Sequence, residues 1–239
     1  MHYLDGSYFF DICILICATR RVGMIRQKVI YADSYRGYRV NNGQRGEYGN
    51  YPCVLDSIHE RLSWMTDRHC KVLFIRFDVR FPSWFHTDGG NSEISRLFKT
   101  LSERYAYNRT TFHYVWVREQ SREKHQHYHC IAMLDGNKVQ NYRGLHRDVS
   151  LIWGNILGSD PTGLIDYCNK DRNGFSVENG IMLRRPSGRV AGENLAEQRA
   201  AFEDAYERCI YWGSYLAKEN QKMNTPRRMR NYGASAIRR

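Results

Sequence analysis

The clearest pattern along the chain is the alternation of apolar and charged side chains in KVLFIRFDVRFP, residues 71–82. Ile75, Phe77 and Val79 would share one face of an extended chain, because alternate side chains of a β-strand point to opposite sides of the sheet. This stretch is therefore predicted to be a strand, which ends at Pro82 because proline cannot donate to the hydrogen-bond ladder.

Two more stretches, TTFHYVWVRE at residues 110–119 and HQHYHCIAML at residues 125–134, predict strands joined by a short polar loop as a hairpin. GIMLRR, residues 180–185, predicts one further strand. Apolar residues at helical spacing predict four helices, and Asn91 or Ser92 can cap the second of them. The helices are expected over residues 54–68, 91 or 92 to about 107, around 146–157, and about 193–221.

The core elements follow the order β-α-β-β-α-β, with an extra helix at each end. This is the order of ferredoxin-like and RNA-recognition-motif-like antiparallel sheets, so we expect an α+β fold. In that topology the strand at residues 125–134 lies between the other two strands of the motif. One face of the sheet is expected to be packed by helices, and the other to carry an active site that the added C-terminal helix covers.

The chain is expected to divide into an N-terminal extension with a basic arm at residues 1–50, a central domain at 51–222 and a basic tail at 223–239. Residues 1–23 are interpreted either as an added strand or as a start assigned too far upstream. They include the apolar run YFFDICILICA, which contains Asp11 and is too short to span a bilayer. We therefore expect no association with a membrane.

The charge of the chain favours a polyanionic partner. Its formal net charge is +11 and its pI is about 9.4, and residues 221–239 contain six basic residues and no acidic one. Nucleic acid is the commonest such partner of a basic protein, and the alternative is that the charge serves solubility alone. Seven cysteines without a C-x-x-C pair indicate reduced thiols in a cytoplasmic protein.

Three histidines stand at alternate positions in KHQHYHC, residues 124–130. If this stretch is extended, His125, His127 and His129 project from the same face, and Glu119 ends the preceding strand on that side of the hairpin. Two neutral imidazoles and one carboxylate form a three-ligand site with open positions, which suits a catalytic divalent cation rather than a closed structural zinc. The alternative is a set of ordinary surface histidines on a hairpin.

A second group of reactive side chains lies in YERCIYWGSYLAKENQK, residues 206–222. Tyr211 and Tyr215 are four positions apart and Lys218 is three positions further, so a helix would place them on one face. Tyrosine can attack a phosphodiester, and a lysine ammonium can neutralise charge in the transition state. Attack on DNA would leave a phosphotyrosine and a free 3′ hydroxyl. The alternative is an aromatic packing stripe.

These motifs, in this order, resemble those of HUH endonucleases, which are rolling-circle replication initiators and relaxases. HYH, residues 127–129, matches the H-U-H motif, in which U is a bulky apolar residue, and YLAK, residues 215–218, matches the Y-x-x-K motif. More closely, KVLFIRFDVRFP, HYVWVREQSREKHQHYHCIAML and YWGSYLAKE resemble the YagK/YfjJ C-terminal domain group of inovirus-type replication proteins. The resemblance covers about residues 51–223.

The resemblance implies that the central domain nicks one DNA strand with a divalent metal, Mg²⁺ or Mn²⁺. His127 and His129 would be metal ligands, with Glu119 as a third. Tyr215 would be the nucleophile, and Lys218 would assist it. The protein would stay attached to the 5′ phosphate while the 3′ end primes synthesis.

Other residues have less specific expected roles. Tyr211 matches the first tyrosine of initiators in which two tyrosines alternate. His125 is expected to lie outside the metal ligands or to contact DNA, because HQH lacks an apolar middle residue. Asp78 is expected to form a salt link to an arginine, or to support the metal. Tyr167 begins a second Y-x-x-K match, YCNK, whose neighbours predict a loop. Further DNA contacts are expected from the arm near Arg36 and from Arg76, Arg227, Arg228 and Arg230.

Several other functions fit parts of this sequence. A DNA-binding protein could have the fold without the chemistry, and a relaxase or transposase would share the active site. H-x-H with a glutamate also suits a metallohydrolase or a cupin-like oxygenase that acts on a small molecule. No G-x-x-x-x-G-K-[ST] motif is present, so an initiator acting on single-stranded or supercoiled DNA at an origin would need a host helicase and polymerase, in the cytoplasm of a bacterial host cell.

Overall fold

The structure is a computed structural model of the 239-residue chain, and it describes residues 29–120, 125–170, 176–177, 179–219 and 229–237. The segment 1–23, interpreted as an added strand or a misassigned start, lies outside the described residues, as do Arg227 and Arg228. None of the helices in the described part of the chain combines the length and apolar character that a membrane span requires.

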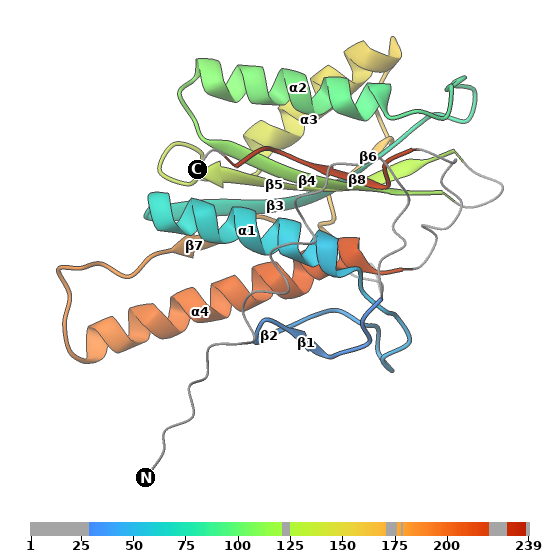
Figure 1. Ribbon diagram of the computed structural model, residues 1–239. Coiled ribbons are helices and arrows are strands. Elements are labelled where there is room, and N and C mark those ends of the chain that lie inside the picture. Colours follow the sequence, from blue (N-terminus) through green and yellow to red (C-terminus); the bar gives the residue numbers. More distant parts are fainter. Residues whose placement is uncertain (1–28, 121–124, 171–175, 178, 220–228, 238–239) are drawn as a thin grey trace.

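The centre of the fold is a six-stranded antiparallel sheet (Figure 1). Its strands are β3 (Lys71–Arg80), β4 (Phe112–Glu119), β5 (His127–Asp135), β6 (Ile165–Asp166), β7 (Ile181–Arg184) and β8 (Tyr232–Ala234). They are ordered β6-β3-β5-β4-β8, and β7 also pairs with β3. The predicted α+β class is confirmed, and β5, the strand of the histidines, lies between β3 and β4 as expected.

Helices cover both faces of the sheet (Figure 1). They are α1 (Pro52–Arg68), α2 (Ser92–Tyr107), α3 (Arg143–Leu157) and α4 (Glu193–Gly213). Cys130 and Leu134 of β5 belong to the core under α2 and α3, whereas Ile131 and Met133 belong to the core under α1 and α4. We expected only the added C-terminal helix on the second face. α1 covers it as well, because the residues of β5 on that side are also apolar and need burial.

The edges of the sheet differ from the simple β-α-β-β-α-β scheme. β7 pairs with the first half of β3, and the two-residue β6 pairs with its end. On the opposite edge β8, a strand that the sequence did not predict, pairs with β4. Its residue Gly233 lies so close to Trp116 that a Cβ atom would come within 2.5 Å of the indole ring. A strand of only three residues is too short to show an alternating pattern of apolar and polar side chains, so the sequence did not reveal β8.

α4 ends at Gly213, and the chain continues as a 3₁₀ turn, η1 (Ser214–Ala217), so the predicted helix as far as residue 221 is wrong. The reason lies in the pairing of the backbone. The N–H group of Tyr51 donates to the carbonyl oxygen of Ala217 at 2.8 Å, which replaces a bond within a longer helix. Hydrogen bonding with the N-terminal arm therefore ends the helix before Tyr215.

The N-terminal arm packs against the same side of the sheet as α1 and α4 (Figure 1). It contains a small hairpin of β1 (Ser34–Tyr35) and β2 (Tyr38–Arg39). Val40 and Tyr51 are buried in the core that α1 and α4 form. The basic arm expected within residues 1–50 therefore includes a docked hairpin.

Candidate active site

Neighbouring strands bring the predicted metal ligands together. Glu119 of β4 lies opposite His127 of β5 in the antiparallel register, and Val117 lies opposite His129. The Nε2 atoms of His127 and His129 are 3.5 and 3.0 Å from Glu119 Oε2. One ligand atom from each of these three residues lies within 4.8 Å of the others. The hairpin therefore assembles the group that its sequence predicted.

The metal-ligand group, Glu119, His127 and His129, is mostly buried. The side chains of Glu119 and His129 are 2% and 4% exposed, and that of His127 is 25% exposed. Glu119 Oε1 also lies 3.6 Å from the ammonium nitrogen of Lys218. Burial of a carboxylate is costly unless cations compensate its charge. Two imidazole nitrogens and a carboxylate oxygen suit a divalent cation, so this group could hold a metal ion.

Asp78 of β3 fixes the orientation of His129. The two residues face each other across β3 and β5, with Asp78 Oδ1 2.7 Å from His129 Nδ1. Burial lowers the pKa of His129, but the carboxylates of Asp78 and Glu119 outweigh it and raise that pKa above its usual value. The contacts of the described residues include no salt link from Asp78 to an arginine. The carboxylate instead holds the imidazole with Nε2 directed at Glu119.

Tyr215, in η1, lies against the metal-ligand group. Its ring centroid is 5.2 Å from that of His129, and the two rings are nearly perpendicular at 87°. The guanidinium carbon of Arg76 is 4.0 Å from the centroid of the Tyr215 ring, and the Lys218 ammonium nitrogen is 3.7 Å from it. The expected nucleophile, the expected assisting lysine and one of the expected DNA-binding arginines therefore meet beside the histidines.

Tyr211 reaches the same pocket from a different element. Because α4 ends before Tyr215, the argument that one helix face carries both tyrosines and Lys218 is wrong, although all three residues line the pocket. Tyr211 is 42% exposed, and the guanidinium carbon of Arg39 lies 5.5 Å from its ring centroid. Tyr211 thus lies at an exposed position of α4, whereas Tyr215 lies deeper, beside His129.

A pocket of about 1070 Å³ opens between the sheet, α4 and the chain at β2. Its charged lining is mixed: the basic residues are Arg39, Arg76, Arg80, Lys170, Arg208 and Lys218, and the acidic ones are Asp78, Glu119, Asp166, Asp204 and Glu207. Arg76 is only 8% exposed, and its Nε atom has no hydrogen-bond partner among the described residues. A buried guanidinium that faces a pocket favours an anionic ligand, because its donors otherwise remain unsatisfied.

Sequence reasoning missed three of these basic residues. Arg80 follows Arg76 by four positions on β3, so the two side chains share a face, and the alternation of that strand could have identified it. Its guanidinium lies 3.6 Å from a carboxylate oxygen of Asp166. Arg39 and Arg208 come from β2 and α4, and no local pattern relates either residue to the histidines.

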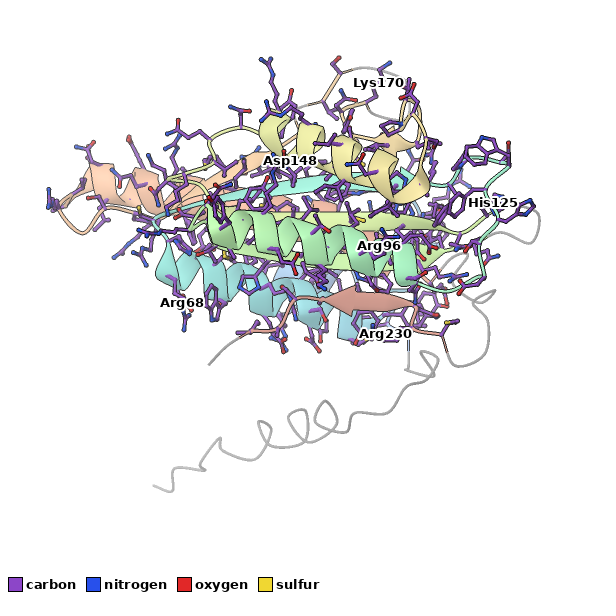
Figure 2. The ribbon with its side chains drawn as sticks, turned by 90° about the horizontal axis from the view of Figure 1, so that it is seen from above. Arg68, Arg96, His125, Asp148, Lys170 and Arg230 are labelled. Carbon is purple, nitrogen blue, oxygen red and sulfur yellow. The ribbon has the colours of Figure 1, made fainter. Side chains whose placement is uncertain are left out.

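Two of the residues expected to contact DNA lie outside this pocket. His125 precedes β5, and its Nε2 atom is 3.0 Å from the carbonyl oxygen of Ser83. Arg230 precedes β8, and its carbonyl oxygen accepts a hydrogen bond from Asn91 at 3.0 Å. Figure 2 shows these two side chains at separate places on the molecule. Their contacts with DNA stay predictions that the pocket does not support.

The second Y-x-x-K match is in the loop after β6, as its neighbours predicted. The Tyr167 ring stacks on the His146 ring with centroids 4.1 Å apart, and its hydroxyl lies 2.7 Å from that of Ser150. Tyr167 itself is not among the residues that line the pocket, although Lys170 is. The hydroxyl is therefore committed to a structural hydrogen bond.

Comparison with known proteins places the chain in a family. The family model of the YagK/YfjJ C-terminal domain matches residues 31–173, which are more than half of the chain. The match includes Asp78 and the metal-ligand group, and it ends before Tyr215. No curated protein and no solved structure matches the chain. The chain thus belongs to the YagK/YfjJ C-terminal domain family.

Proposed function

We propose that this protein is a metal-dependent HUH endonuclease that nicks one DNA strand and initiates rolling-circle replication, as inovirus-type replication proteins do. The proposal depends above all on the position of Tyr215. Its ring lies 5.2 Å from that of His129, one of three residues that could hold a metal ion, and next to Arg76 and Lys218. A tyrosine beside a metal site and two basic groups is well placed to attack a phosphodiester.

The metal-ligand group would hold the metal, for which we propose Mg²⁺ or Mn²⁺. When bound, such an ion neutralises the charge of a phosphodiester and polarises its phosphorus–oxygen bonds. Asp78 supports this role because its contact with Nδ1 of His129 keeps Nε2 directed at Glu119. Glu119 and His129 are buried, and with His127 they line the pocket in which the strand would lie.

Tyr215 forms the covalent bond in this mechanism. Its phenolic oxygen attacks phosphorus, the bond between phosphorus and the 3′ oxygen breaks, and the phenol proton passes to water while the 3′ oxygen takes up a proton. The products are a 5′-phosphotyrosine and a free 3′ hydroxyl. Reversal of the same step rejoins the strand. Arg76 and Lys218, at 4.0 and 3.7 Å from the ring, stabilise negative charge on the phosphate.

Tyr211 is proposed as a second nucleophile that alternates with Tyr215, because it lines the same pocket. The substrate would be single-stranded or supercoiled DNA at a replication origin, whose phosphates Arg76, Lys218 and the other basic residues of the pocket would bind. A host helicase and polymerase would supply unwinding and synthesis, in the cytoplasm of a bacterial host cell.

Other functions predict different behaviour. A relaxase or transposase would form the same covalent intermediate and differ only in the DNA that it selects. A DNA-binding protein without catalysis would form no covalent intermediate. An enzyme for a small neutral molecule would have no use for the buried Arg76 guanidinium, whose Nε atom has no hydrogen-bond partner among the described residues.

The test is the covalent intermediate itself. Purified protein is mixed with circular single-stranded DNA of its own replicon and Mn²⁺ or Mg²⁺, and a denaturing gel is examined for a protein–DNA band. We expect a band that requires metal and is lost in His127→Ala, His129→Ala and Tyr215→Phe, while Tyr211→Phe shows whether one tyrosine or two react. Absence of the band with both metals would overturn the proposal in favour of DNA binding alone. A band that persists in Tyr215→Phe would move the nucleophile to Tyr211 or Tyr167.

A further inference from the structure

Arg39 is an exposed cation at the mouth of the candidate active site. It ends β2, the second strand of the small N-terminal hairpin, and it lines the pocket together with residues of the sheet and α4. Among the described residues, its guanidinium has no hydrogen bond or ion pair, and its one aromatic contact is with the ring of Tyr211 at 5.5 Å. An arginine without a carboxylate partner is available to bind an anion.

The hairpin holds a second arginine with a different environment. Arg36 lies three residues before Arg39, and its guanidinium nitrogen is 2.7 Å from Asp56 of α1. It lines another cavity, with Tyr38 and His59, and not the pocket of Tyr215. The hairpin therefore directs one arginine to a structural ion pair and the other to the candidate active site.

The arrangement of Arg39 and Tyr211 repeats that of Arg76 and Tyr215. In each pair a guanidinium lies over a tyrosine ring that lines the pocket, at 5.5 Å in the exposed pair and at 4.0 Å in the deeper pair, of buried Arg76 and half-buried Tyr215. The pocket of about 1070 Å³ lies at the upper end of the volumes of small-ligand sites, so it has room for more than one nucleotide unit. Two cation–tyrosine pairs in one pocket suit two phosphates of a strand.

We infer that Arg39 binds the phosphate that neighbours the scissile one, so that the β1–β2 hairpin forms one wall of a channel for single-stranded DNA. This inference rests on the proposed function, because it takes the pocket as the site where the strand is held. The contact is to the backbone and carries no base preference. Arg39 acts as a positioning residue: it sets the strand over Tyr215 without taking part in the bond change.

The test measures how salt weakens the binding of DNA. Tyr215→Phe protein in EDTA, which can neither form the adduct through Tyr215 nor use a metal, is titrated with a fluorescent 20-nucleotide oligo-dT at several salt concentrations. Each phosphate contact to single-stranded DNA contributes about 0.7 to the slope of log K against log salt. We expect Arg39→Gln to lower the slope by about 0.7 and to weaken binding about fivefold at physiological salt. Arg39→Lys should keep the slope.

Arg36→Gln is the matched control, because Arg36 lies in the same hairpin and has the same charge. It should leave the slope unchanged, and thermal melting of each variant checks that the hairpin stays folded. Equal slopes for Arg39→Gln and Arg36→Gln would overturn the inference, even where the wild-type protein forms its adduct normally. If binding depends on Arg39 but the wild-type protein forms no adduct, the role of Arg39 in binding DNA is supported and the proposed nicking is contradicted. No binding of the oligonucleotide at all would overturn this inference, whereas the proposed nicking is decided separately by the adduct on replicon DNA.

Discussion

The chain contains two Y-x-x-K segments, Tyr215–Lys218 and Tyr167–Lys170, and the structure gives them different surroundings. The Tyr215 ring lies edge-on against His129 of the metal-ligand group. The Tyr167 ring is stacked on His146, and its hydroxyl is bonded to Ser150. Identical spacing therefore produces one tyrosine beside candidate metal ligands and one inside a packed, hydrogen-bonded contact. The neighbours of the ring distinguish the two, and the motif does not.

Both segments are held by partners distant in the sequence. Asn50 of the arm bridges to Lys218, which fixes the chain just after Tyr215. The side-chain amide of Asn179 donates to the carbonyl oxygens of Arg76 and Tyr167, which fixes the other segment to β3. Backbone contacts with distant residues are thus common to both segments. The difference between them lies in what each ring faces, and this is what substitution can test.

The largest expected effect separates the two tyrosines. Tyr215→Phe removes the proposed nucleophile and should lower the rate of adduct formation at least about 1000-fold, because the chemistry then lacks its attacking oxygen. Tyr167→Phe keeps the stacked ring and should stay within about threefold of wild type. Time courses on a denaturing gel measure both rates. A large loss in Tyr167→Phe with Tyr215→Phe active would reverse the assignment.

The two lysines should differ next. Lys218→Met removes an ammonium that lies 3.7 Å from the Tyr215 ring and 3.6 Å from Glu119, and it should slow adduct formation about 100-fold, as loss of one charge-stabilising donor does. Lys170→Met is the matched control. It removes a cation of the pocket that belongs to the second segment, and it should slow adduct formation less than about tenfold. Single-turnover rates at saturating DNA and metal separate this effect from weaker binding. Equal losses in the two variants would contradict the comparison.

The sequence predicted the metal-ligand group because that group depends on local pattern. A short loop joins two alternating strands, so the positions of Glu119, His127 and His129 follow from one hairpin. The position of Asp78 opposite His129 depends on the register between β3 and β5, which are separated by a helix and β4. Alternation within each strand does not fix that register, and so the sequence left two roles open for Asp78, a salt link to an arginine or support of the metal, of which the contact with His129 fits the second.

The surroundings of Tyr215 were only partly predictable for a similar reason. The spacing of Tyr215 and Lys218 identified the residues, but the helical reason for grouping them with Tyr211 was wrong. The turn η1 exists because backbone groups of the arm pair with it, and no pattern near Tyr215 reports on residues 49–51. The position of Arg39 was missed on the same grounds, since the hairpin that carries it docks through tertiary contacts.

A smaller effect is expected at the two aspartates near the segments. Asp78→Asn keeps the shape of the side chain but removes the charge that holds His129, and loss of such a support typically weakens metal binding 10- to 100-fold. Asp166→Asn is the control, because Asp166 lines the same pocket directly before Tyr167 and pairs with Arg80 instead. Calorimetric titration with Mn²⁺ measures both affinities. Equal affinities in the two variants would mean that Asp78 does not act through His129.

The smallest effect tests whether the contact of Tyr167 is structural. Burial lowers the pKa of His146, the partner of the Tyr167 ring, to about 4, whereas a histidine of the unfolded chain titrates near 6.5. Between these values the unfolded state binds more protons, so stability is present above pH 6.5 and is lost as the pH falls toward 4. At pH 5.5 we therefore expect His146 to lower the free energy of unfolding by about 1 kcal/mol relative to pH 7.5, after allowance for solvent screening.

The measurement is urea unfolding in EDTA at pH 7.5 and pH 5.5. His59 and His113 are also buried, each with a pKa lowered by burial to about 4, so the wild-type protein should lose the contributions of all three groups. His146→Gln removes one titrating group, and it should be less sensitive to acid by about 1 kcal/mol even though its stability at pH 7.5 is lower. An unchanged acid sensitivity would mean that His146 is not held neutral by burial. The stacked contact of Tyr167 with His146 would then not be the structural contact that distinguishes Tyr167 from Tyr215.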